Sequence, residues 1–105
     1  METIIISDHA FKRWRERKNL TYNISISKIA RQAYTKGLDS RSYIDTAFGS
    51  WITYSLRKYP ARNRFIKVYK NYVFVYAKVG DGILLVTVME VPEKFYYIKN
   101  YAIMK

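Results

Sequence analysis

The chain has no cysteine and only one histidine, His9, among its 105 residues. Without cysteine it can form neither a disulfide framework nor a thiolate zinc site. Its eight Asp and Glu residues are scattered along the chain, so we expect no metal site and no cofactor. No glycine-rich phosphate loop or nucleophile elbow is present, because Gly80 and Gly82 fall in a predicted hairpin turn. These absences disfavour nucleotide-cofactor chemistry and serine or cysteine nucleophiles.

Long apolar runs are also missing, although half of the residues are apolar or aromatic. No stretch reaches the roughly 18 residues of a membrane-spanning helix. The opening Met-Glu-Thr lacks the basic region and apolar run of a signal peptide. We therefore expect a cytoplasmic protein with no membrane partner. The length predicts a single domain over residues 1–105 with a small core.

Acidic residues are too few to balance the bases: 19 Lys and Arg face 8 Asp and Glu, a formal charge of +11. Such a charge indicates a polyanionic partner, and nucleic acid is the commonest one. An acidic protein or an anionic membrane surface would match the same charge. The eleven tyrosines suit both a small core and a surface on which bases stack.

The bases begin in the segment Ser7–Arg17, which predicts a helix capped by Ser7 or Asp8 after a short strand at Thr3–Ile6. At about 100° per residue, Phe11 and Trp14 face inward with Ala10. The opposite side gathers polar and mostly basic residues: His9, Lys12, Arg13, Glu16 and Arg17. Arginine can hold phosphate and histidine can move a proton. In the competing interpretation the helix face is merely solvated, Arg13 pairs with Glu16, and His9 is a structural residue near the cap.

A second helix is predicted from a Ser25 cap to Lys36, with Gly37 as its stop. Its apolar face consists of Ile26, Ile29, Ala30 and Ala33. A third, short helix is expected from Asp39 or Ser40 to Gly49, with Ile44, Ala47 and Phe48 inward. From Trp51 onward the pattern alternates with a period of two, which favours strands.

Three apolar runs, Phe65–Tyr69, Tyr72–Val79 and Ile83–Val91, predict an antiparallel meander with turns at Lys70-Asn71 and Asp81-Gly82. If Tyr69 faces Tyr72 and Gly80 faces Ile83, one sheet face is aliphatic. We expect the helices to cover that face and to bury Val75 and Val86.

The other predicted sheet face interleaves aromatic rings with lysines, among them Lys67, Tyr69, Tyr72, Tyr76 and Lys78. Flat rings can stack on bases, and positive charge can hold the backbone between them. The alternative is that the C-terminal segment, residues 91–105, covers this face as a second core layer. The pattern of that segment fits either a helix or a strand.

The order of strand, two helices and meander resembles the RelE/HigB/ParE toxin fold. The opening motif H-A-x-x-R-x-x-E-R is similar to that of small RelE-like proteins of phages and bacterial toxin loci; here it consists of His9, Ala10, Arg13, Glu16 and Arg17. Thr87-Val88-Met89 is similar to the end of a strand in such proteins. The resemblance covers residues 3 to 91. It implies an α+β fold with an N-terminal strand and two to three helices on one face of a three- to four-stranded antiparallel sheet.

The resemblance also implies metal-independent RNA cleavage, in which the ribose 2′-hydroxyl attacks its own phosphate. We predict His9, Arg13 and Tyr76 as catalytic residues. The predicted RNA-binding residues are Lys12, Arg17, Lys67, Tyr69, Tyr72 and Lys78. The implied partners are RNA, including ribosome-associated mRNA, and an antitoxin or host protein. The alternatives are a non-catalytic basic protein that binds nucleic acid or docks on a host complex, and an inhibitor of an enzyme such as gyrase.

Overall fold

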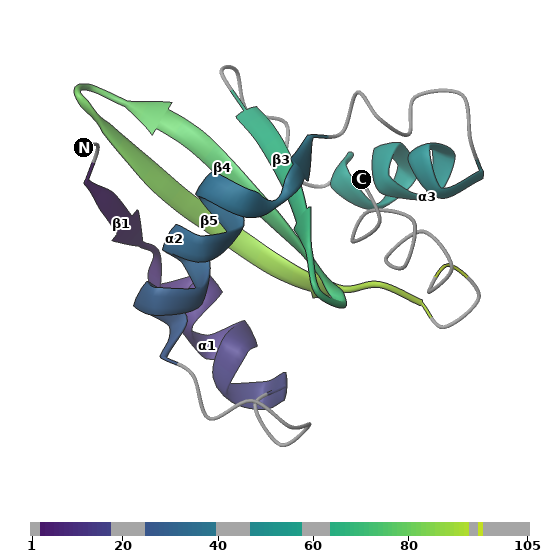
Figure 1. Cartoon of the computed structure of the whole chain (residues 1–105), viewed down its shortest axis with the longest axis horizontal. Coiled ribbons are helices and arrows are strands. Elements are labelled where there is room, and N and C mark those ends of the chain that lie inside the picture. Colours follow the sequence, from purple (N-terminus) through teal and green to yellow (C-terminus); the bar gives the residue numbers. More distant parts are fainter. Residues whose placement is uncertain (1–2, 18–24, 40–46, 58–63, 93–94, 96–105) are drawn as a thin grey trace.

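The computed structural model describes residues 3–17, 25–39, 47–57, 64–92 and 95 (Figure 1). Within these residues the protein is α+β, as predicted, with three helices and a five-stranded sheet. The elements, in chain order, are β1 (Ile4–Ile6), α1 (Asp8–Arg17), α2 (Ile26–Lys36), β2 (Leu38–Asp39), α3 (Ala47–Leu56), β3 (Arg64–Tyr69), β4 (Tyr72–Val79) and β5 (Gly82–Glu90).

The sheet is mixed and has five strands, so the prediction of an antiparallel sheet of three to four strands is wrong. Its strand order is β1-β5-β4-β3-β2, in which β1 runs parallel to β5 and every other pair is antiparallel. The fifth strand is β2, where Asp39 lies opposite Lys67 on β3. The sequence placed Asp39 at the start of a helix, because its side chain suits a cap as well as a strand end.

The junction of β1 and α1 is held by Ser7. Its hydroxyl oxygen accepts the backbone N–H of Ala10 at 3.0 Å and donates to the carbonyl of Val86 at 2.9 Å. Its own backbone N–H donates to the carbonyl of Leu85 at 3.1 Å. Of the two residues predicted as the N-cap, Ser7 and Asp8, the structure selects Ser7, which also ties the first turn of α1 to β5.

Both predicted ends of α2 are confirmed. The Ser25 hydroxyl accepts the N–H of Lys28 at 3.3 Å, and the N–H of Gly37 donates to the carbonyl of Ala33 at 2.8 Å. Gly37 has an ordinary φ of −70°, but a Cβ there would lie 2.5 Å from the carbonyl oxygen of Ala33 in α2 and 3.1 Å from that of Val68 on β3. The glycine is therefore required by the close approach of the chain to the last turn of α2 and, second, to β3. The predicted inner face is buried: Ile26, Ile29, Ala30 and Ala33.

Helix α3 lies where the sequence predicted a helix end followed by alternation, so both predictions are wrong. Phe48, Ile52 and Leu56 recur every four residues and are buried. Gly49 lies inside the helix, where glycine costs only about 1 kcal/mol relative to alanine. Burying three large apolar side chains outweighs that cost. Phe48 points inward as predicted, Ala47 is exposed, and Ile44 lies outside the described residues.

Helices cover both faces of the sheet, which corrects the expectation that they pack on one (Figure 1). Helices α1 and α2 lie on the aromatic face, whereas α3 and Phe95 lie on the aliphatic face. The sheet is apolar on both sides, so each side requires a cover. The aromatic-side core contains Trp14, Tyr72, Phe74, Tyr76, Ile83, Leu85 and Val88 with the inner faces of α1 and α2. The aliphatic-side core contains Ile66, Val68, Val73, Val75 and Val91 with the inner face of α3.

The predicted pairing of β3 with β4 is confirmed: Tyr69 lies opposite Tyr72 across a turn in which Lys70 has a φ of 55°. The predicted pairing of β4 with β5 is wrong. That turn is Gly80-Asp81, with Gly80 at a φ of 58°, and Val79 lies opposite Gly82.

A β-bulge then shifts the register of this pair again. Tyr76 lies opposite Leu85 and Val75 opposite Thr87, which leaves Val86 as the extra residue. Val75 is fully buried, as predicted, but Val86 is only partly buried.

We predict that Ser7→Ala lowers the free energy of unfolding by about 1–2 kcal/mol, because the helix loses its cap and the Val86 carbonyl loses its donor. Urea unfolding measures this change. The matched control is Ser25→Ala, which removes a more exposed cap whose hydroxyl accepts a hydrogen bond from Lys28 of its own helix. Equal losses in the two variants would show that the bond to Val86 contributes nothing.

We also predict that Thr87→Val raises the free energy of unfolding by about 1 kcal/mol. The Thr87 hydroxyl is fully buried and has no hydrogen-bond partner in the described part of the chain. An unpaired buried hydroxyl is destabilising, and valine keeps nearly the same shape. A lower melting temperature in the variant would contradict this account of the site.

Candidate nucleic-acid interface

The outer surface of α1 and α2 is strongly basic. Its exposed bases are Lys12 and Arg15 on α1 with Lys28, Arg31 and Lys36 on α2. Asp8 and Glu16 are the only carboxylates on the two helices, since α2 has none. Both helices pack on the same sheet face (Figure 1). Their exposed bases therefore belong to the helices that cover this one face. The three bases of α2 were not predicted as site residues. The sequence did contain a signal for them, because the polar face of α2 carries basic residues and no acidic ones.

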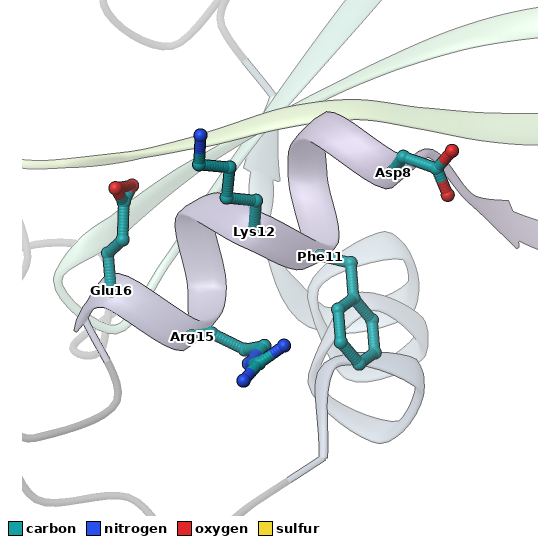
Figure 2. Close-up of a pocket in the computed structure, with 5 residues that line it drawn as sticks. All are labelled: Asp8, Phe11, Lys12, Arg15 and Glu16. Atoms are coloured by element: carbon teal, nitrogen blue, oxygen red, sulfur yellow. The ribbon is translucent and has the colours of Figure 1, made fainter.

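A shallow groove runs along α1, lined by Asp8, Phe11, Lys12, Arg15 and Glu16 (Figure 2). The sequence placed Phe11 in the core beside Trp14, which is wrong: the Phe11 side chain is 48% exposed, whereas Trp14 is buried. Trp14 packs edge-on against Tyr72 at 5.2 Å between ring centroids, so it fills the space under the helix. The Arg15 guanidinium carbon lies 6.0 Å from the centroid of the Phe11 ring.

His9 and Arg13 lie on α1, one helical turn apart. His9 is exposed. The Nη1 atom of Arg13 lies 3.8 Å from Oε1 of Glu16. Arg13 therefore pairs with Glu16, as the competing interpretation predicted. At this distance and exposure the pair contributes little to stability. Arg17 belongs to α1, but its side chain lies outside the described residues.

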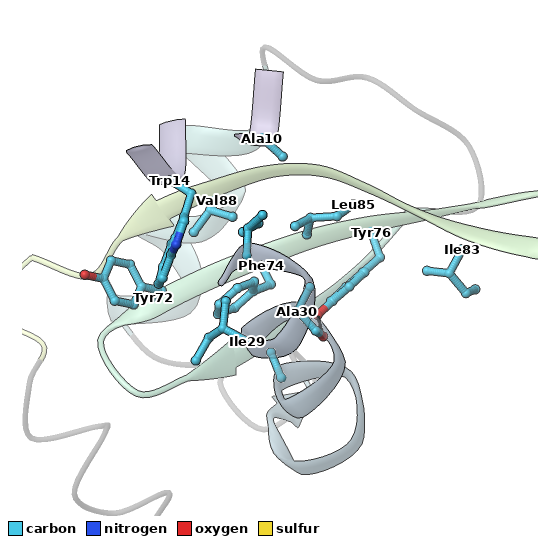
Figure 3. Close-up of a cluster of buried hydrophobic side chains, with 12 residues drawn as sticks. Ala10, Trp14, Ile29, Ala30, Tyr72, Phe74, Tyr76, Ile83, Leu85 and Val88 are labelled. Carbon is cyan, nitrogen blue, oxygen red and sulfur yellow. Dashed lines mark hydrogen bonds between the residues drawn. The ribbon is translucent and has the colours of Figure 1, made fainter. Parts of the chain in front are cut away.

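Tyr76 is a core residue, which corrects its prediction as a catalytic group (Figure 3). It is fully buried beneath α2, and its hydroxyl donates to the carbonyl of Ala30 at 2.6 Å. Burial, together with the neighbouring Tyr34, raises the pKa of Tyr76 well above its ordinary value. The phenol therefore stays neutral and cannot reach an RNA at the surface.

The prediction of a base-stacking sheet face is wrong as well. Tyr72 is buried under Trp14, and Tyr69 is partly buried, its hydroxyl lying 3.5 Å from Oε1 of Gln32 on α2. Lys67 is partly buried on β3, and only Lys78, near the end of β4, is exposed. The aromatic face is a core layer, as the alternative interpretation predicted. The described elements that cover it, however, are α1 and α2.

In that alternative interpretation the C-terminal segment, residues 91–105, provides the cover. Residues 91, 92 and 95 of the segment are described. Val91 and Phe95 belong to the core on the aliphatic side of the sheet, where Phe95 packs against Phe48 and Trp51. The prediction for residues 93–94 and 96–105 lies outside the described residues.

No family model, curated protein or solved structure matches this chain. In the described ranges, no three His, Asp or Glu side chains gather where they could hold a metal ion. None of the described helices is long and apolar enough to cross a membrane.

We predict that Tyr76→Phe leaves RNA binding unchanged and lowers the free energy of unfolding by about 0.5–1.5 kcal/mol, because it removes one buried hydrogen bond. Filter binding and thermal melting of the same preparation measure the two effects. If the variant kept wild-type stability but lost an RNA-dependent activity, Tyr76 would be a functional residue and this account would be wrong.

Proposed function

We propose that this protein binds RNA through the outer surfaces of α1 and α2. The observation that carries this proposal is the helical layer itself, where five exposed bases and two carboxylates lie on the two helices that cover one sheet face. A phosphate backbone gains affinity mainly by releasing counterions to such a surface. Arginines, here Arg15 and Arg31, add paired hydrogen bonds to phosphate that lysine cannot make.

We further propose that the chain is a RelE-like protein. The succession β1, α1, α2 and the β3–β5 meander supports this, together with the motif on α1. The elements β2 and α3 are additions between the helices and the meander. Cleavage of RNA by such a protein needs a group that moves protons. With Tyr76 in the core, His9 is the residue of the predicted set that remains on the surface for this role.

A non-catalytic RNA-binding protein is the second candidate, and the burial of Tyr72 and Tyr76 favours it. The predicted catalytic residues do not meet in one open site, because His9 is exposed on α1 while Tyr76 is enclosed under α2. Incubating RNA with the protein in EDTA, from about pH 5 to pH 9, separates the candidates. Cleavage that is lost in His9→Ala and in Arg13→Lys supports the enzyme, and tight binding without cleavage supports the non-catalytic protein.

For binding itself, we predict that affinity falls tenfold or more between about 50 and 200 mM salt, because several phosphates are contacted. The double variant Lys28→Gln with Arg31→Gln should weaken binding and reduce the slope of log K against log salt by about two. Fluorescence anisotropy of a labelled RNA measures both quantities.

The matched control is Arg57→Gln with Lys78→Gln, which removes two exposed bases outside the helical layer. We expect it to change the salt slope far less. Equal effects of the two double variants would show that RNA binds elsewhere, and a salt-independent affinity would exclude a polyanionic ligand.

A further inference from the structure

The groove on α1 has a feature that electrostatic binding does not need, the exposed ring of Phe11. The large apolar side chains exposed in the described residues are Ile5, Phe11, Tyr54 and Val79. Of these, Phe11 lies in a groove with two cations, Lys12 and Arg15. Phenylalanine has no polar tip that would account for its exposure to water. A flat ring in one groove with two cations matches a nucleotide, which has an apolar base face and a charged phosphate.

We propose that Phe11 is the stacking platform for an unpaired base of single-stranded RNA, with Lys12 and Arg15 holding the adjoining phosphates. This inference rests on the proposed function and names its substrate class. In Figure 2 the Phe11 ring and the Arg15 guanidinium project to the same side of α1, while the Lys12 ammonium lies beyond the helix axis. The Arg15 guanidinium carbon lies over the ring, 6.0 Å from its centroid, so a base laid on the other face of the ring has this cation nearby.

The groove selects a single strand because only an unpaired base offers a free face. In a duplex both faces of each base are stacked, and RNA-binding proteins contact its outside by shape and backbone. Aromatic stacking between bases and side chains is the usual way in which proteins hold single strands, with cations along the backbone.

The two carboxylates of the groove fit this arrangement. Asp8 and Glu16 lie at the two ends of the lining stripe, and both repel phosphate. Glu16 also lies 3.8 Å from Arg13, which offsets part of its charge. Phosphate is thereby directed to Lys12 and Arg15 between them. A carboxylate at the end can accept a hydrogen bond from the exocyclic amino group of a base.

The test compares a labelled single-stranded RNA of about 12 nucleotides with the duplex of the same length at fixed salt. We expect Phe11→Leu to weaken single-strand binding about 5- to 150-fold, the loss typical of one stacked base, and to leave duplex binding within about twofold. Phe11→Tyr keeps a ring and should keep the affinity. The matched control is Tyr54→Leu, which removes an exposed ring on α3 and should change neither affinity. Thermal melting verifies that each variant is folded.

The outcomes separate this inference from the proposed function. If the wild-type protein binds RNA and Phe11→Leu binds the single strand equally well, the stacking platform is wrong and the basic surface stands. Equal losses on single strand and duplex also overturn the platform, because a base in a duplex cannot use it. If the wild-type protein binds neither RNA, the proposed function fails and the platform fails with it.

Discussion

The hydrogen bond from the hydroxyl of Ser7 to the bulged carbonyl of Val86 ties the start of α1 to the sheet. An extra residue in a strand leaves backbone groups without a ladder partner, and in an interior strand such groups need another partner. Ser7 supplies the donor at 2.9 Å while it caps α1. The same bulge turns Leu85 and Val88 to one side of β5, although three positions separate them. Helix α1 therefore begins at the point where β5 changes its alternation, directly over the residues that it covers.

The chain needs this arrangement because its sheet is apolar on both faces. Tyrosine can fill such a core only if its hydroxyl finds an acceptor, and Tyr76 finds one in the backbone of α2 at 2.6 Å. Charged side chains cannot be buried in the same way, so the bases of α1 and α2 lie on the outer surface of the helical layer. The aromatic residues of the sheet thus stabilise the fold, and the bases of α1 and α2 remain exposed to solvent.

Local signals made α2 and the β3–β4 turn predictable. Ser25, Gly37 and four small or aliphatic residues define α2 within its own segment, and the pairing of Tyr69 with Tyr72 follows from a two-residue turn. The β4–β5 register was predicted wrongly for two reasons: the turn lies at Gly80-Asp81, and the bulge at Val86 is bonded to Ser7, 79 positions away. Periodicity could separate the two sheet faces but could not assign α1, α2 and α3 to them, since both faces are apolar.

The candidate site was misplaced for the same reason, because periodicity did not show which sheet face α1 and α2 cover. Its cations were visible in the sequence, but the aromatic partner was sought on the sheet, where rings are plentiful, and not at Phe11. By the helical period of about 100° per residue, Phe11 and His9 project to opposite sides of Lys12 on α1. A single strand bound as proposed, on Phe11 and across Lys12, would therefore also pass His9. Binding and any cleavage would then share α1, whereas Tyr76, enclosed under α2, would take part in neither.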